Sequence, residues 1–335
     1  LWFDGGLFDN ATVLDLDGDG VSILHGITTL DWSAIEPSIF GTLFTRSLDP
    51  SKRSQLGAQY TSKDDILLIV EPVLMAPLRR EWAEVQDKAR RLAQRRDEAS
   101  TKAQRAKLDN ELRSLVMGFV QKIRTIRVLD PACGSGNFLY ICLRLLLDLE
   151  KEVINFCGEV GLQPFFPEVN PSQLYGIEIN DYAHELAQAT VWIGYLQWLH
   201  ENGYGFPSEP ILKPLTNIKL MDAILAFDAD GNPIEPEWPE AEVIVGNPPF
   251  LGGGKLRREL GGKYVENLFG LYGDRLPNFS DLVCYWFEKA RAMIEIGALK
   301  RSGLLATQAI RGGANRTVLD RINTTTVIIF EHCRG

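Results

Sequence analysis

The 335-residue sequence contains no apolar run that approaches about 18 residues, the length at which a helix becomes a candidate for crossing a membrane. Its first residues, Leu1 to Asp4, lack the basic flank and apolar core of a secretory signal peptide. Hydrophobic residues make up 45% of the chain and charged residues 24%, as is typical of a globular protein. These features together predict a cytoplasmic location.

Metal-ligand patterns are also missing. The five cysteines include no CxxC pair, so neither a disulfide framework nor a zinc site is predicted, and the four histidines have no ligand spacing. The acidic stretch Asp15 to Gly20 is similar to the first half of a calcium loop, but Gly26 stands at the twelfth position, where such a loop has Glu. An acidic hairpin turn is therefore expected there, without a metal.

A general excess of positive charge is absent, because the net charge is −9. This argues against a chain that is mostly a nucleic-acid-binding surface. Positive charge is concentrated from Arg79 to Lys107, where ten basic residues face five acidic ones. Apolar residues recur there at three-to-four spacing without Gly or Pro, so residues 79–115 are predicted to form a charged helical insert, as a long helix or a helical hairpin. A solvated helical face explains its charge better than phosphate contact does.

No GxxxxGK[ST] phosphate loop occurs, but a different glycine loop does. It joins a predicted strand at 126–129 to a predicted helix at 137–152, a context in which glycines let backbone amides approach a ligand. Leu139 replaces the third glycine of GxGxxG, which disfavours dinucleotide binding. The candidate ligand-binding residues of the loop are Asp130, Pro131, Ala132, Cys133, Gly134 and Gly136.

Two further predicted strands end in carboxylates. Residues 173–177 are followed by Glu178 and a helix that runs to Leu199, and residues 216–220 are followed by Met221 and Asp222. In α/β nucleotide-binding folds, an acidic residue at the end of the second strand binds ribose hydroxyls. Each carboxylate alone is equally well explained as a helix cap or turn residue.

The stretch VIVGNPPF, residues 243–250, runs from a buried apolar strand into Asn247, Pro248, Pro249 and Phe250. The two prolines stiffen the chain and remove two amide donors, so the Asn247 side chain and nearby carbonyls form a rigid group of acceptors at the strand end. An ordinary proline turn is the alternative on these residues alone. With the other strands, the pattern predicts an α/β fold with a doubly wound, mostly parallel sheet.

Six motifs, taken together and in this order, resemble those of S-adenosylmethionine-dependent adenine-N6 DNA methyltransferases of the gamma class. They are LGAQYTS (56–62), DPACGSGNFL (130–139), GIEIN (176–180), MDAI (221–224), GNPPF (246–250) and DLVCYWFEKA (281–290). The sequences IFGTLF and ATQAIRGGANRTVLDRI, and the Leu-Gly-Gly after NPPF, are similar to the MmeI-like methylases of combined restriction-modification enzymes and related phage-defence systems.

The resemblance implies a class I Rossmann-like methyltransferase domain at residues 56–335, preceded by a small mixed segment at 1–55. It also implies site roles. Asn247 and the Pro248 carbonyl would bind the target adenine within the rigid NPPF motif that Pro249 completes, and Phe250 would stack on the flipped base. The cofactor would contact Tyr60, Thr61, Asp130, Pro131, Ala132, Cys133, Gly134, Gly136, Glu178, Ile179, Asp222, Ala223 and Asn247, with the two acidic residues after the second and third strands binding its ribose and its adenine amino group.

This sequence departs from the family at its end, because Gly335 comes before the expected reversed strand and target-recognition domain. Contact with double-stranded DNA is therefore expected through a domain missing from this chain, and the chain alone is expected to be inactive. A restriction nuclease or other defence-system subunits are possible partners. Protein glutamine methylation and a non-catalytic cofactor-binding fragment stay open as alternatives. Cytosine-N4 methylation is less favoured, since those enzymes more often carry Ser at the position of Asn247.

Overall fold

The computed structural model describes residues 15–29, 35–39, 41, 61–205, 215–324, 329–330 and 333–334. Its centre is a six-stranded sheet in which every described pair of neighbours is parallel, with the order β3-β2-β1-β6-β7-β9. The strand order reverses between β1 and β6, as it does in doubly wound sheets. The predicted fold class is therefore confirmed. The strands are β1 (Val128–Asp130), β2 (Leu174–Glu178), β3 (Ile218–Leu220), β6 (Val243–Gly246), β7 (Arg301–Leu304) and β9 (Ile329–Phe330).

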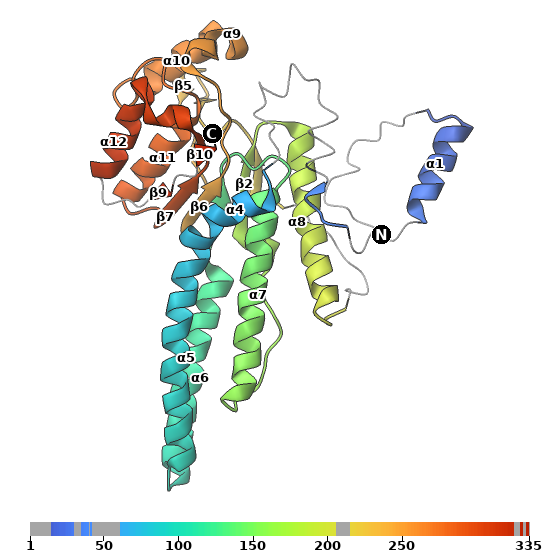
Figure 1. Cartoon of the computed structure of the whole chain (residues 1–335), viewed down its shortest axis with the longest axis vertical. Helices are drawn as coiled ribbons and strands as arrows, with labels where there is room; N and C mark the ends of the chain where they lie inside the picture. Colours follow the sequence, from blue (N-terminus) through green and yellow to red (C-terminus); the bar gives the residue numbers. More distant parts are fainter. Residues whose placement is uncertain are drawn as a thin grey trace.

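Helices cover both faces of the sheet (Figure 1). Neighbouring residues of β6 enter different cores, because Val243 and Val245 belong to one buried cluster and Ile244 to the other. This explains why the strand is apolar throughout. On the first face lie α4 (Lys63–Val70), the π-helical turn η1 (Glu71–Met75), α7 (Asn137–Glu159) and α8 (Asp181–Glu201), and on the second face lie α11 (Val283–Glu295) and α12 (Arg316–Thr324).

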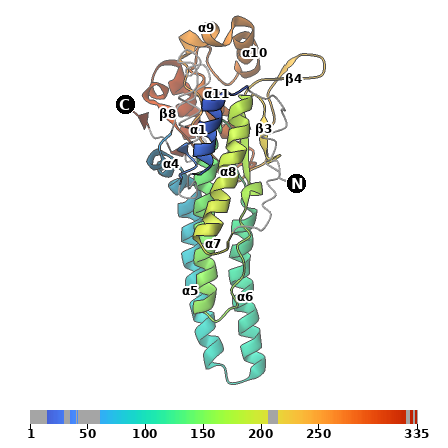
Figure 2. The same cartoon turned by 90° about the vertical axis from the view of Figure 1, so that its right-hand side faces the viewer.

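The segment after β6 builds a small helical layer at one end of the molecule (Figures 1 and 2). Further elements of the fold are short and lie in this layer, next to the ends of β3 and β7, or directly before β2. These elements are η3 (Gly253–Lys255), α9 (Leu256–Leu260), α10 (Gly262–Tyr272), η4 (Gln308–Arg311), η5 (Gly313–Asn315), the antiparallel pair β4 (Ala226–Phe227) and β5 (Pro233–Ile234), the parallel pair β8 (Ala306–Thr307) and β10 (Cys333–Arg334), and η2 (Pro171–Gln173) before β2.

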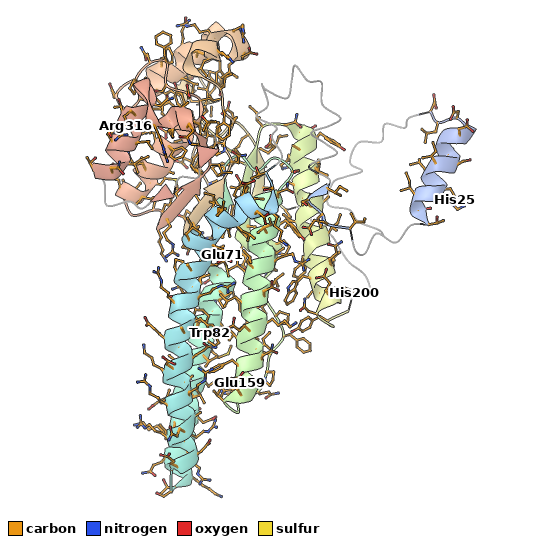
Figure 3. All side chains as sticks on the ribbon, viewed as in Figure 1. His25, Glu71, Trp82, Glu159, His200 and Arg316 are labelled. Carbon is orange, nitrogen blue, oxygen red and sulfur yellow. The ribbon has the colours of Figure 1, made fainter. Side chains whose placement is uncertain are left out.

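The charged insert is a helical hairpin of α5 (Ala76–Glu98) and α6 (Lys102–Thr125), longer at both ends than the predicted 79–115. Trp82 fixes it to α7, since its ring stacks on Phe119 with centroids 5.0 Å apart and meets Phe156 edge-on at 5.1 Å. Its indole N–H donates to Glu152 Oε1 at 2.7 Å. The hairpin continues past Glu159 at the end of α7, and its turn lies at the opposite end of the molecule from α9 and α10 (Figures 1, 2 and 3).

The hairpin turn expected at Asp15 to Gly20 is wrong. Asp17 is instead the N-cap of helix α1 (Gly18–Thr28), and its Oδ1 accepts a hydrogen bond from the Gly20 amide at 2.8 Å. The helix buries no residue and stands apart from the sheet (Figures 1 and 3). The boundary predicted between residues 55 and 56 lies outside the described residues.

The described residues also bear on the membrane and metal predictions. None of the described helices combines the length and the apolar character needed to cross a membrane. In the same part of the chain, His, Cys, Asp and Glu side chains form no group of three or more that could hold a metal ion.

Candidate active site

The predicted site residues lie at the carboxyl edge of the sheet, where β1, β2, β3 and β6 end. The strand order reverses at β1 and β6, and ligands of open α/β sheets bind at such a point. The end of β6 packs against a side chain of β1, because a Cβ built on Gly246 would lie 2.5 Å from Asp130 Oδ1. A larger residue at position 246 would therefore have to displace this buried carboxyl group.

The glycine loop turns through two left-handed residues, Gly134 at φ 52° and Gly136 at φ 83°. The two glycines serve different purposes. A Cβ on Gly136 would lie 3.0 Å from the Ala187 backbone, so this residue lets the start of α7 pack against α8. A Cβ on Gly134 would meet no atom of the described residues within 4 Å, so the backbone there is open on this side, as a ligand-binding loop requires.

Glu178 ties this loop to the end of β2. Its Oε2 accepts from the Gly134 amide at 2.8 Å, and its Oε1 accepts from the amides of Ile179 and Asn180 at 3.0 and 2.8 Å. A carboxylate offers about four acceptor positions, so these bonds leave roughly one for a ligand. Glu178 therefore holds the loop in shape in addition to the ligand-binding role that the sequence indicates.

Burial changes the pKa values of the acidic residues at the ends of β1 and β2 and of the cysteine in the glycine loop. It raises the pKa of Asp130 to about 8, and the nearby negative charge of Glu178 adds to the effect, while a hydrogen bond from the Ala132 amide to Oδ1 at 3.0 Å opposes it. Burial also raises the pKa of Glu178, against the three backbone amides. Burial raises the pKa of the Cys133 thiol well above its usual range, which agrees with a structural cysteine.

Asp222 follows β3 and lies beside the end of β2, because the Met221 amide donates to the Glu178 carbonyl at 2.9 Å. Its Oδ1 accepts from the amides of Ile224 and Leu225 at 2.8 and 3.1 Å. Its Oδ2 accepts from the Tyr264 hydroxyl of α10 at 2.7 Å. One acceptor position on Oδ2 thus remains, and the carboxylate cannot rotate freely.

Two further aromatic side chains hold the next residues of this turn. The Trp238 indole donates to the Ala223 carbonyl at 2.7 Å, and the Tyr272 hydroxyl donates to the Ile224 carbonyl at 2.9 Å. The predicted cofactor residues Asp222 and Ala223, and Ile224 after them, are therefore fixed by side chains that the sequence did not single out. Their only signal was that they are aromatic residues close in sequence to NPPF.

Asn247 is held by the first described residue of the segment before α4. Its Nδ2 donates to Thr61 Oγ1 at 2.8 Å, across 186 positions of sequence. Thr61 is only 7% exposed. The other side-chain atom, Asn247 Oδ1, is buried and has no hydrogen-bond partner among the described residues. The amide is thus oriented, and its acceptor oxygen is free for a ligand.

The other predicted residues differ in their exposure to solvent. Pro248 is buried, Pro249 is half-buried, and half-buried Phe250 packs against both cores. Ile179 is 59% exposed, whereas Ala223 is buried. Tyr60 lies outside the described residues. The structure thus brings together the residues from Thr61, the glycine loop, the ends of β2 and β3, and NPPF.

Residues 100–332 match the family described as MmeI, DNA-methyltransferase domain. The chain belongs to this family. It is also similar to DNA methyltransferase A of Bacillus subtilis (strain 168), with 30% identity over 263 residues, which are 77% of this chain and 27% of that protein. The predicted resemblance to MmeI-like methylases is confirmed.

A solved structure supports the same assignment. The type IIL restriction-modification enzyme MmeI in complex with DNA superposes with a TM-score of 0.72 at 28% identity, over 95% of this chain and 40% of that one. This chain therefore spans well under half the length of either protein.

Proposed function

We propose that this chain transfers a methyl group from S-adenosylmethionine to N6 of an adenine in duplex DNA. The observation that supports this proposal most directly is the orientation of the Asn247 amide. Its Nδ2 is bound to Thr61, while its buried Oδ1 lacks a partner among the described residues. A buried acceptor without a partner is costly unless a ligand satisfies it. An exocyclic amino group of a flipped base is a donor of the required kind.

The residues at the sheet edge fit the cofactor. Glu178 would bind the ribose through its remaining acceptor position, Asp222 would accept from the adenine amino group through Oδ2, and the open space beside Gly134 would admit the amino-acid part near Thr61. The bound cofactor supplies an electrophilic methyl group on a sulfonium. The chain's own residues orient it and hold the target nitrogen in line with it.

The NPPF residues account for the activation of the base. The adenine N6 lone pair is conjugated into the ring, so N6 is a poor nucleophile. Asn247 Oδ1 and the Pro248 carbonyl would accept its two hydrogens and favour a tetrahedral nitrogen. The prolines keep both acceptors in place, which is electrostatic preorganisation. Phe250 would stack on the base, which must leave the duplex because N6 is inaccessible inside it.

The relatives support a proposal about the partners and the cellular setting. The similar solved enzyme is a restriction-modification enzyme bound to DNA. We assign this chain to a cytoplasmic restriction-modification or related phage-defence system, with target recognition by a domain outside the chain and an associated or fused nuclease.

The test is methylation by the full-length protein, followed by mapping of modified bases. N6-methyladenine at a defined DNA site is expected. Asn247→Ala should lose more than about 90% of the transfer rate while affinity for S-adenosylmethionine changes little, because the base loses its acceptor and the cofactor keeps its contacts with Glu178 and Asp222. Thr61→Val should lower the rate less, since the Asn247 acceptor remains although its amide can rotate. Asn110→Ala, an exposed change on α6, is the matched control.

Other outcomes would overturn the proposal. Methylation of a protein glutamine would support the NPPY-type protein methyltransferases instead. Cofactor binding without transfer to any DNA would support a non-catalytic role, and N4-methylcytosine would move the target to another base.

A further inference from the structure

Phe279 is the one non-glycine residue with positive φ among the described residues, at 68°. Bulky side chains rarely adopt this conformation, and it persists only where the surrounding structure imposes it. Its side chain is also 61% exposed. The fold therefore maintains a strained backbone in order to present an aromatic ring to solvent.

The neighbouring residues impose this conformation. Ser280 is fully buried, and both its amide and its hydroxyl donate to the Pro277 carbonyl, at 3.2 and 2.8 Å. The amide of Asp281 donates to Asn315 Oδ1 at 2.8 Å, and the Leu282 amide donates to the Leu251 carbonyl at 2.8 Å. The loop is thus fixed on both sides of the exposed ring.

The same loop is joined to the segment that follows NPPF. Asp281 Oδ1 accepts from the Gly253 amide at 2.9 Å, and a Cβ built on Gly253 would lie 1.7 Å from the Phe279 carbonyl oxygen. Gly253 lies six residues after Asn247, a span of at most roughly 22 Å. Phe279 is therefore within roughly six to seven base pairs of any base that Asn247 binds, at about 3.4 Å per base pair.

The segment that follows NPPF is rich in positive charge, although its two arginines are paired with Glu266 and Glu259. Residues 252–263 contain four basic residues and one acidic residue, although the whole chain is acidic. Lys255 and Lys263 are exposed, and the described residues include no ion-pair partner for either. Arg257 lies over the Phe269 ring at 5.9 Å, and Phe269 meets Phe279 edge-on at 5.8 Å. Exposed cations beside an aromatic ring are the combination that binds a nucleic-acid strand.

We propose that Phe279 stacks on a base of the bound DNA, and that Lys255 and Lys263 contact the phosphates beside it. This inference rests on the proposed function and adds a DNA contact on the chain itself, next to the catalytic motif. The exposure of the ring supports the inference, because its edge-on contact with Phe269 leaves 61% of the side chain accessible on a loop that is otherwise fixed.

The test compares Phe279→Gly with Phe279→Trp in the full-length protein. Glycine relieves the strain and removes the ring, so the midpoint of thermal unfolding should stay equal or rise while duplex affinity falls about tenfold, the effect typical of removing one base–aromatic stack. Tryptophan keeps a stacking face and should retain most of the affinity. Cofactor affinity should be unchanged in both variants.

Phe166→Ala is the matched control. Phe166 is 79% exposed and also makes one edge-on ring contact, with Tyr204 at 6.4 Å, but it lies between α7 and β2, at the amino edge of the sheet. It should bind DNA as the wild type does.

Two results separate the inference from the proposed function. Wild-type protein that methylates DNA, together with a Phe279→Gly variant of unchanged duplex affinity, would overturn the stacking role alone. Wild-type protein that neither binds nor methylates DNA would overturn both, before any variant is compared.

Discussion

The hydroxyl of Tyr264 on α10 donates a 2.7 Å hydrogen bond to Oδ2 of Asp222, the carboxylate proposed to accept from the cofactor's adenine. The bond leaves Asp222 one orientation, with one free acceptor position on Oδ2. Burial, with the charge of Asp222, raises the pKa of Tyr264 far above its usual value, so the hydroxyl remains a donor at any physiological pH. We therefore propose Tyr264 as a positioning residue for cofactor binding.

Tyr264→Phe should weaken binding of S-adenosylhomocysteine by about 1 kcal/mol, the typical net value of one hydrogen bond. Binding of an analogue without the 6-amino group should not change, because Asp222 has no donor to meet in that ligand. Calorimetry with both ligands measures this. Equal losses for the two ligands would show that Tyr264 supports the fold and does not orient Asp222.

Glu178→Ala should weaken cofactor binding by about 1.5–3 kcal/mol, the range for hydrogen bonds to a charged group. It should also lower the free energy of unfolding, since the amides of Gly134, Ile179 and Asn180 lose their acceptor. Glu178→Gln, which keeps an acceptor oxygen, should be intermediate. Calorimetry and thermal unfolding test both effects, with Asp181→Ala as an exposed control at the same sheet edge. Unchanged affinity in Glu178→Ala would remove this residue from the site.

Asp130 should make stability depend on pH. Its pKa rises from 3.8 to about 8 in the folded protein, so between these values the folded state keeps a proton that the unfolded state has released. The free energy of unfolding should therefore fall as pH rises from about 4 to about 8, by up to roughly 1.4 kcal/mol per pH unit. Asp130→Asn should reduce this slope. Urea unfolding of both proteins at pH 5 and pH 8 measures it, and equal slopes would contradict the prediction.

The charged hairpin should not contribute to DNA binding. Its turn lies at the opposite end of the molecule from α9 and α10 (Figure 1), so changing Arg91, Arg95 and Lys102 together to Gln should alter duplex affinity and its salt dependence little. Lys255→Gln with Lys263→Gln should instead reduce the salt slope by about 0.9 for each phosphate that is no longer neutralised. Fluorescence anisotropy at several salt concentrations compares the two sets. A larger effect from the hairpin set would reverse the assignment.

Much of the sheet and of the cofactor edge could be predicted from local sequence. Buried apolar runs precede the glycine loop, Glu178 and NPPF, and glycines mark the loop after β1, so the predicted strand ends lie close to the observed ones. A helical hairpin was also among the predictions. Its first and last residues were not predicted, because apolar residues continue from the hairpin into the neighbouring α4 and β1.

The contacts that orient the site could not be predicted in this way. Thr61 and Asn247, which are hydrogen-bonded, lie 186 positions apart in the sequence, and Tyr264 and Asp222 lie 42 apart. A local sequence pattern therefore cannot predict either hydrogen bond. At the N-terminus, the glycines and aspartates of residues 15–20 suit both a hairpin turn and a helix cap. The helix forms because the Asp17 side chain accepts a hydrogen bond from the Gly20 amide, and composition alone does not indicate this bond.

The hairpin of α5 and α6 also sets an order for folding. Its helices are joined by only three residues, 99–101, so their contacts close short loops and form rapidly. The pairing of β1 with β6, by contrast, joins Val128 to Val243 and must wait for a long loop to close. We therefore expect the hairpin to be native while Asn247 and the glycine loop are still apart, so that hydrogen exchange protects α5 and α6 before cofactor binding becomes possible.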